Sequence, residues 1–237
     1  MKYNFPTKLK KGDKVAIIAP ARSMHIINNA TRANAKEHFQ QLGLELVFGN
    51  NVEEVDFFNS ASIEKRVDDI HWAFSDPDIS AIFTVIGGFN SNQLLDYIDW
   101  DLIKANPKVF CGFSDITILN NSIYAKTGLV NYYGPHYSTL GQKFELEYTL
   151  KFLRQAVIEN DDIEVVPSDN WTDDEWWMDQ ENRALIKNEG YWTIHEGEAE
   201  GKILGGNVGT FNLLHGTQYM PDISDSILFI EDDSESQ

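Results

Sequence analysis

One stretch of the sequence decides the fold: VFCGFSDI, residues 109–116. Its apolar start is typical of a buried strand, and a helical pattern begins at Asp115 and continues to Lys126. A strand that turns into a helix at Gly-x-Ser is a nucleophile elbow, which lifts the serine hydroxyl clear of the sheet. The sequence therefore predicts an α/β sheet with Ser114 as a candidate nucleophile.

The alternative for Ser114 is structural. Serine is a favoured helix N-cap, and Asp115 would then sit in the first turn beside the positive helix end. Ile116 also stands where a hydrolase elbow has its second glycine. The local pattern leaves both interpretations open.

Strands and helices alternate on both sides of this stretch. Strands are predicted at 15–19, 44–48, 79–86 and 108–111, and helices at 29–42, 63–74, 94–98 and 115–126. This order implies a doubly wound, mostly parallel sheet covered on both faces. Sites in such sheets lie at the carboxyl ends of the strands. We therefore expect the loops 20–23, 87–90 and 112–115 along one edge.

The pattern changes after a helix predicted at 146–158. Residues 169–190 are acidic and rich in tryptophan, without periodicity, and are predicted to form a long loop. Beyond it, strands are expected at 191–195, 198–204 and 226–230, with a helix at 207–214.

We predict three parts: an N-terminal α/β domain at 1–168 that carries the nucleophile, a linker at 169–190, and the start of a C-terminal α/β domain at 191–237. A domain of about 50 residues is marginal alone. The C-terminal domain is therefore expected to be incomplete, and the chain to be truncated.

Composition excludes several classes of partner and site. The 237 residues carry a net charge of −18, which argues against nucleic-acid polymers and anionic membranes. One cysteine, no apolar run of about 18 residues and no signal peptide favour the cytoplasm. No metal site or cofactor is predicted, because no His-Glu-x-x-His or Cys-x-x-Cys spacing occurs and no Gly-x-Gly-x-x-Gly follows the first strand.

Two further features are open to a functional or a structural interpretation. Residues 87–92, GGFNSN, end a strand and would either cradle an oxyanion or form a turn capped by Ser91. Among six histidines only His136 has a suggestive setting, on a loop after a strand, where a hydrogen-bonded structural histidine is the alternative.

Several motifs in order carry a family resemblance. They are IGGFNSNQLL at 86–95, FCGFSDIT at 110–117, YGPH at 133–136, LGGN at 204–207 and IED at 230–232. Together they resemble the LD-carboxypeptidase family of serine peptidases, and most closely its microcin C self-immunity branch. The resemblance implies that Ser114 is the nucleophile, that the amides of Gly88 and Asp115 form the oxyanion hole, and that Glu231 is the acid of a Ser–His–Glu triad.

The family histidine lies several dozen residues beyond the position of Glu231, and none of the six histidines here matches it. Resemblance to the family therefore implies an enzyme, while the activity of this chain is left open. The alternative is an inactive homologue that sequesters the ligand.

The branch also bears on the substrate. LD-carboxypeptidases tend to have arginine before the glycine pair, where this chain has Ile86. Resemblance to the immunity branch implies hydrolysis of an amide or acyl bond in a small peptide-nucleotide or aminoacyl-sulfamoyl nucleotide. Peptidoglycan tetrapeptides are the alternative substrate, and a homodimer is expected.

The resemblance also suggests residues that bind substrate. A tryptophan of the long loop would stack on the nucleobase, with Trp176 and Trp177 as the candidates and packing at a domain interface as the alternative. Phe89, Asn90 and Asn207 complete the expected substrate-binding set.

Overall fold

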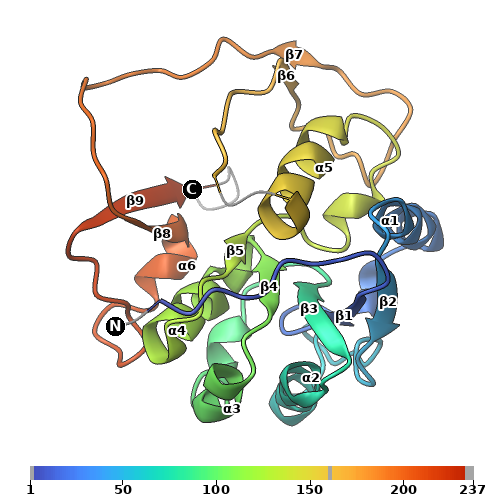
Figure 1. Ribbon diagram of the computed structural model, residues 1–237. Helices are drawn as coiled ribbons and strands as arrows, with labels where there is room; N and C mark the ends of the chain where they lie inside the picture. Colours follow the sequence, from blue (N-terminus) through green and yellow to red (C-terminus); the bar gives the residue numbers. More distant parts are fainter. Residues whose placement is uncertain (1–2, 160–161, 233–237) are drawn as a thin grey trace.

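The computed structural model of the chain describes residues 3–159 and 162–232. Its centre is a five-stranded sheet of order β2-β1-β3-β4-β5, with every neighbouring pair parallel (Figure 1). The strands are β1 (Lys14–Ile18), β2 (Glu45–Phe48), β3 (Ile79–Thr84), β4 (Val109–Gly112) and β5 (Tyr132–Tyr133). The prediction of a doubly wound parallel sheet is confirmed.

Helices cover both faces of this sheet because its strands are apolar on both sides. The helices of the chain are α1 (Asn29–Gln41), α2 (Ile63–Ser75), α3 (Trp100–Ala105), α4 (Thr117–Thr127), α5 (Glu147–Arg154) and α6 (Val208–Asn212). Alternate β1 residues take opposite sides, so that Ile18 packs with α2, α3 and α4, and Ile17 packs with α1 and α5 (Figure 1). A π-helical turn, Gln155–Glu159, continues α5.

The helix boundaries follow the local signals in the sequence. Asn28 and Ser62 cap α1 and α2 by accepting hydrogen bonds from the main-chain N–H groups of Thr31 and Lys65. Gly128 ends α4 with a φ of +74°, the left-handed conformation that favours glycine.

A second, two-stranded parallel sheet joins β8 (Lys202–Asn207) to β9 (Ser226–Glu231). It lies against α4, where the Asn121 side chain donates to the Gly205 carbonyl at 2.7 Å and accepts from the Gly205 amide at 3.3 Å. The pair continues through Gly205 and Gly206, although two consecutive glycines are more typical of a turn. The three-part division at 1–168, 169–190 and 191–237 stays a prediction.

The strand predicted at 191–195 is wrong. Among the residues that the structure describes, 191–195 have no strand partner, and Trp192 and Ile194 are each 91% exposed. The predicted long loop is mostly irregular, but β6 (Asn170–Trp171) and β7 (Ile186–Lys187) pair antiparallel within it. Within residues 3–159 and 162–232, no helix has both the length and the apolar content to cross a membrane.

Candidate active site

Ser114 adopts the strained backbone of an elbow. Its φ is +58°, a left-handed conformation that costs a non-glycine residue about 1–3 kcal/mol. A helix N-cap has extended backbone, and here Phe113 holds that position without a side-chain cap. The N-cap interpretation of Ser114 is therefore wrong. Backbone strain of this kind is often stored at functional sites.

Two glycines make room for the serine. A Cβ added to Gly112 would lie 2.3 Å from Thr84 Oγ1 and 3.0 Å from Ile116 Cγ2, so the turn needs glycine there. A Cβ added to Gly87 would lie 3.0 Å from Ser114 Cβ and 3.1 Å from its Oγ. Gly87, in the loop after β3, therefore faces the Ser114 hydroxyl directly.

The side chain of Asp115 fastens this glycine turn to the elbow. Its carboxylate accepts hydrogen bonds from the amides of Asn90 (3.1 Å) and Ser91 (3.0 Å), and Ser91 Oγ donates to the Asp115 carbonyl at 2.7 Å. Burial raises the pKa of the Asp115 carboxyl, while the two amides and Arg66 oppose that shift. Ser91 thus links the two turns, and its interpretation as a helix cap is wrong.

Arg66 joins a third loop to these two. Its buried guanidinium donates to the carbonyls of Pro20 (3.1 Å) and Asn90 (3.2 Å) and to Gln93 Oε1 (2.7 Å), and burial lowers its pKa. The loops after β1, β3 and β4 therefore meet at the carboxyl edge of the sheet, as predicted.

Two main-chain amides at this edge have unused hydrogen-bonding capacity. Within residues 3–159 and 162–232, the N–H groups of Gly88 and Asp115 donate to no protein acceptor. They belong to the two turns that flank the Ser114 hydroxyl. This availability is what an oxyanion hole requires.

Glu231 reaches the elbow through a tyrosine. The Tyr133 hydroxyl donates to Glu231 Oε1 at 2.5 Å and accepts from the Ser114 amide at 3.0 Å. Burial and the Glu231 carboxylate raise the pKa of Tyr133, which keeps the phenol protonated. Glu231 lies opposite Asn207 in the β8–β9 register, so the end of β9 is anchored at the elbow.

The three other expected substrate-binding residues near the elbow differ in their availability. Asn207 is buried and caps α6 through the Thr210 amide, and Asn90 is buried with its Nδ2 donating to Ser60 Oγ at 2.9 Å. Phe89 is 54% exposed beside the glycine turn. Phe89 therefore has surface to offer a ligand, whereas the two asparagines hold local structure.

His136 is deeply buried beside the same edge. Its Nδ1 lies 2.7 Å from Thr84 Oγ1, and its ring lies 4.3 Å from that of Phe113. Its Nε2 has no hydrogen-bond partner within the described residues and lies 3.5 Å from the Cβ position of Gly87. Burial lowers the pKa of His136 to about 3, opposed by the Phe113 main chain, so its imidazole is neutral near pH 7.

The two candidate tryptophans contact each other and stand apart from the elbow. Their rings form an edge-to-face pair 5.9 Å apart, with Trp177 53% exposed. The segment that follows is anchored elsewhere, since Gln180 Oε1 accepts from the Lys143 amide at 2.6 Å. Among the described residues, no hydrogen bond joins Trp176 or Trp177 to Ser114, and the ring contact that the two tryptophans share is with each other.

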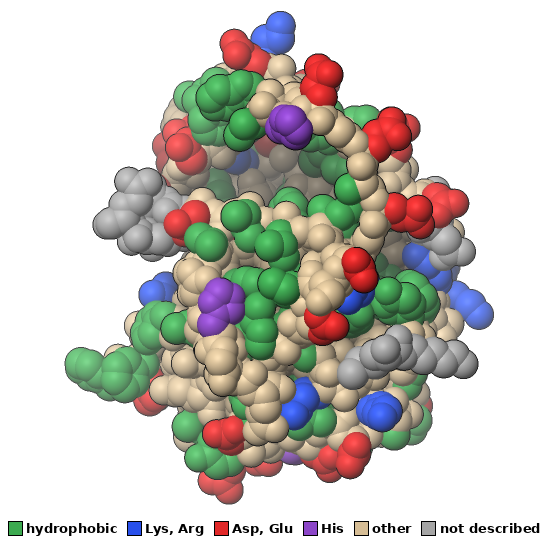
Figure 2. Space-filling model, turned by 90° about the vertical axis from the view of Figure 1, so that its left-hand side faces the viewer, with side chains coloured by type: hydrophobic (Ala, Val, Ile, Leu, Met, Phe, Trp, Pro, Cys, Tyr) green, Lys and Arg blue, Asp and Glu red, His purple; other side chains and the backbone are tan. Residues whose placement is uncertain are grey.

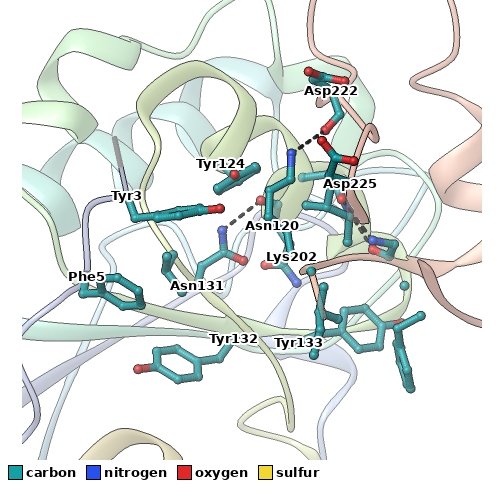
Figure 3. A pocket seen from close by; sticks show the side chains of 18 of the residues that line it. Tyr3, Phe5, Asn120, Tyr124, Asn131, Tyr132, Tyr133, Lys202, Asp222 and Asp225 are labelled. Atoms are coloured by element: carbon teal, nitrogen blue, oxygen red, sulfur yellow. Dashed lines mark hydrogen bonds between the residues drawn. The ribbon is translucent and has the colours of Figure 1, made fainter. Parts of the chain in front are cut away.

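A groove of about 1280 Å³ lies beyond Tyr133, between β5 and β8. Figure 3 shows Tyr3, Tyr124 and Tyr132 around it, with Lys202 donating to the Asp222 carbonyl at 3.2 Å. Figure 2 shows a face of the molecule hollowed beneath an arch of chain, with hydrophobic side chains exposed there. Ser114 does not line this groove, so the groove and the elbow are separate features joined by Tyr133. Across residues 3–159 and 162–232, no cluster of histidine, cysteine or carboxylate side chains could hold a metal.

A strained serine between a glycine turn and a parallel strand is typical of the α/β hydrolases that carry a nucleophile elbow. Comparison with known families agrees. Residues 15–134 match the model of the LD-carboxypeptidase N-terminal domain, and residues 200–237 match the model of its C-terminal domain, both of peptidase family S66. The chain belongs to this family of peptidases.

Individual relatives refine this assignment. The Bacillus subtilis protein named "Putative carboxypeptidase YocD" is 49% identical over 229 residues, covering 97% of this chain and 70% of the relative. The Escherichia coli "Microcin C7 self-immunity protein MccF" is 32% identical over 243 residues, covering 96% of this chain and 69% of MccF. The resemblance to both the carboxypeptidases and the immunity branch is confirmed.

Solved structures agree. A MccF-like protein from Bacillus anthracis is 54% identical, with a TM-score of 0.97 over 98% of this chain and 71% of that one. MccF in complex with aspartyl sulfamoyl adenosine is 31% identical, with a TM-score of 0.88 over 96% of this chain and 70% of that one. A small ligand as partner is therefore supported for this fold.

Sequence reasoning missed the side chains that hold the site together. Tyr133 is the first residue of the YGPH motif, but nothing in that motif indicates that its partner is Glu231, far along the chain. Thr84 and Arg66 lie in ordinary strand and helix patterns. The one available signal was the position of Arg66 beside Val67, between Ile63 and Ile70 of the apolar pattern, where an arginine that becomes buried requires acceptors.

Proposed function

We propose that the chain is a serine peptidase or amidase in which Ser114 attacks the carbonyl of a small peptide-nucleotide or aminoacyl-sulfamoyl nucleotide. The observation that carries the proposal is the left-handed backbone of Ser114, whose hydroxyl lies 3.1 Å from the space left empty by Gly87. Resemblance to the immunity branch supports this substrate class. Peptidoglycan peptides are the second candidate, supported by relatives named as carboxypeptidases, such as a murein peptide enzyme of Bacillus subtilis.

The residues have distinct proposed roles. Attack by Ser114 Oγ forms the acyl-enzyme and releases the amine or nucleotide part, and water then hydrolyses the acyl-enzyme. The free amides of Gly88 and Asp115 donate to the oxyanion that forms at the carbonyl oxygen. Glu231 is the proposed acid of the triad, and its link through Tyr133 also orients the Ser114 main chain. Resemblance to the family implies a histidine as the base, and none of the six histidines of this sequence, His136 included, matches its position.

Asn90 and Asn207 support the site in this proposal by holding the turns that face the substrate. Phe89 contacts the substrate from the glycine turn, and Trp176 or Trp177 stacks on a nucleobase. A homodimer in the cytoplasm is the proposed setting, to be checked by light scattering and by cell fractionation.

The test separates nucleophile reactivity from turnover. A fluorophosphonate probe should label the chain, and Ser114→Ala should abolish labelling while the protein stays folded. Labelling of the chain that persists in Ser114→Ala would refute Ser114 as the nucleophile. Calorimetry with aspartyl sulfamoyl adenosine then reports binding, and chromatography of the products reports hydrolysis. Binding without either labelling or hydrolysis would favour the ligand-sequestering alternative.

A further inference from the structure

We propose that Arg22 binds the anionic oxygen-bearing group that follows the scissile bond, with Phe89 forming the apolar wall of this subsite. The proposal rests on the proposed function, because it assumes that Ser114 attacks the substrate. Its chemistry is recognition of one oxyacid group, which is an α-carboxylate in a peptide and the sulfamoyl or phosphoryl linkage in an aminoacyl nucleotide.

The position of Arg22 is set by the glycine turn. Its amide donates to the Gly87 carbonyl at 3.3 Å, and its Cγ lies 3.3 Å from where a Cβ on Gly88 would be. Ser114 Oγ lies 3.1 Å from the corresponding position on Gly87. The serine hydroxyl and the stem of Arg22 therefore flank two consecutive glycines.

The spacing suits a group one residue beyond the scissile carbonyl. Consecutive α-carbons are about 3.8 Å apart, and one extended residue of substrate advances about 3.5 Å. A ligand with its carbonyl at Ser114 and one further residue laid along the glycine pair would bring its terminal oxyacid group toward Arg22. Neither glycine adds a side chain of its own to this path.

The guanidinium of Arg22 is available for such a group. The chain has five arginines, and the other four donate to oxygens: Arg32 to Glu53, Arg66 to Asn90, Arg154 to Glu159 and Arg183 to Gln142. Arg22 is exposed, and within residues 3–159 and 162–232 its guanidinium makes no hydrogen bond or ion pair and lies over an aromatic face. In a protein of net charge −18, Arg22 thus differs from the other four arginines, because its guanidinium has no hydrogen-bond acceptor among the described residues.

The aromatic neighbours are held in place rather than merely exposed. The guanidinium carbon lies 5.4 Å from the ring centre of Phe89, and the Phe58 ring packs edge-to-face on Phe89 at 6.4 Å. Asp56 Oδ1 accepts from the amides of Phe58 (2.8 Å) and Ser60 (3.0 Å), which fixes that loop. Stacking on an aromatic face orients a planar guanidinium for two parallel hydrogen bonds to one oxyacid group.

The experiment compares ligands with and without the anionic group. Binding is measured by calorimetry in the Ser114→Ala variant, so that the ligands are not hydrolysed during the measurement. One ligand pair is N-acetyl-alanyl-alanine and its C-terminal amide; the other is aspartyl sulfamoyl adenosine and an analogue with a neutral amide linkage. Arg22→Gln should weaken binding of at least one anionic ligand about 10- to 100-fold and leave its neutral counterpart unchanged. Arg22→Lys should restore part of the loss, and Arg154→Gln, an exposed arginine on α5, should change nothing.

Each outcome decides the proposal. If Arg22→Gln weakens binding of the peptide acid alone, the group that Arg22 binds is a carboxylate. If it weakens binding of the sulfamoyl nucleotide alone, the group is the sulfamoyl linkage. Equal losses for charged and neutral ligands, no loss, or no binding of any of the four ligands would overturn the assignment of Arg22. Failure of the proposed function is distinguishable, because it appears as absent fluorophosphonate labelling of Ser114 in the unmodified chain.

Discussion

Protonation of His136 should make the protein lose stability in acid. Burial lowers the pKa of this imidazole to about 3 in the folded chain, against about 6.5 when unfolded. Above about pH 6.5 the group is neutral in both states and contributes no pH dependence. Below that, the unfolded chain binds the proton and the folded chain does not, so the free energy of unfolding falls as the pH falls.

The magnitude follows from the size of the shift. Each pKa unit corresponds to about 1.4 kcal/mol, so the loss reaches about 3 kcal/mol near pH 4.5 and approaches about 5 kcal/mol near pH 3. The ring is fully buried and its Nε2 has no partner within the described residues, so solvent does not screen this cost. Buried Asp69 and Asp115, whose pKa values are raised by burial, act in the opposite direction.

The assay isolates His136 by difference. Urea unfolding is measured at about pH 7 and about pH 4.5 for the unmodified chain and for His136→Asn, whose amide reaches the position of Nδ1 beside Thr84. The variant is destabilised at pH 7 by the smaller side chain, but its stability should fall by about 3 kcal/mol less on acidification. Asp69 and Asp115 are present in both proteins, so their contributions to the pH dependence of the free energy of unfolding cancel in the difference. Parallel losses in the two proteins would refute the reasoning.

Three further predictions concern the elbow and the long loop. Tyr133→Phe removes a hydrogen bond from Glu231 and from the Ser114 amide, so the rate of fluorophosphonate labelling should fall about tenfold, and an unchanged rate would contradict the link. Gly112→Ala places a Cβ 2.3 Å from a buried hydroxyl and should lower the free energy of unfolding by about 1–3 kcal/mol, measured in urea. If the more exposed indole stacks on the base, Trp177→Ala should weaken the binding of aspartyl sulfamoyl adenosine by about 1–3 kcal/mol in calorimetry. A loss of binding in Trp176→Ala alone would assign the stacking to the other ring.

Much of the sheet was predictable because its strands are apolar runs bounded by glycine and proline. The alternating apolar pattern predicted a strand wrongly where a tertiary partner decides the outcome. Tyr191, Trp192 and Ile194 have the pattern of a strand but lie exposed, and no described strand pairs with them. Gly205 and Gly206 lie inside β8 because β9 and α4 supply their hydrogen bonds, a long-range effect that glycine's turn preference conceals.

The site was predictable in its loops and less so in its details. The position of Ser114 after a strand indicated the elbow, but a serine that caps a helix and a serine on an elbow can have the same local sequence. Only the observed φ of +58° separates them. The partnership of Tyr133 with Glu231 joins segments far apart in sequence, and no spacing within either motif encodes it.

The end of β9 has a consequence for the order in which the site matures. A ribosome produces the elbow and Tyr133 well before the segment that contains Glu231. Until β9 docks beside β8, the Tyr133 hydroxyl lacks the Glu231 carboxylate as its hydrogen-bond acceptor. The hydroxyl is then not held in place to accept the hydrogen bond from the Ser114 amide. Alignment of the Ser114 main chain through Tyr133 and Glu231 therefore requires that β9 has been synthesised and has docked, so the N-terminal segment alone lacks this alignment.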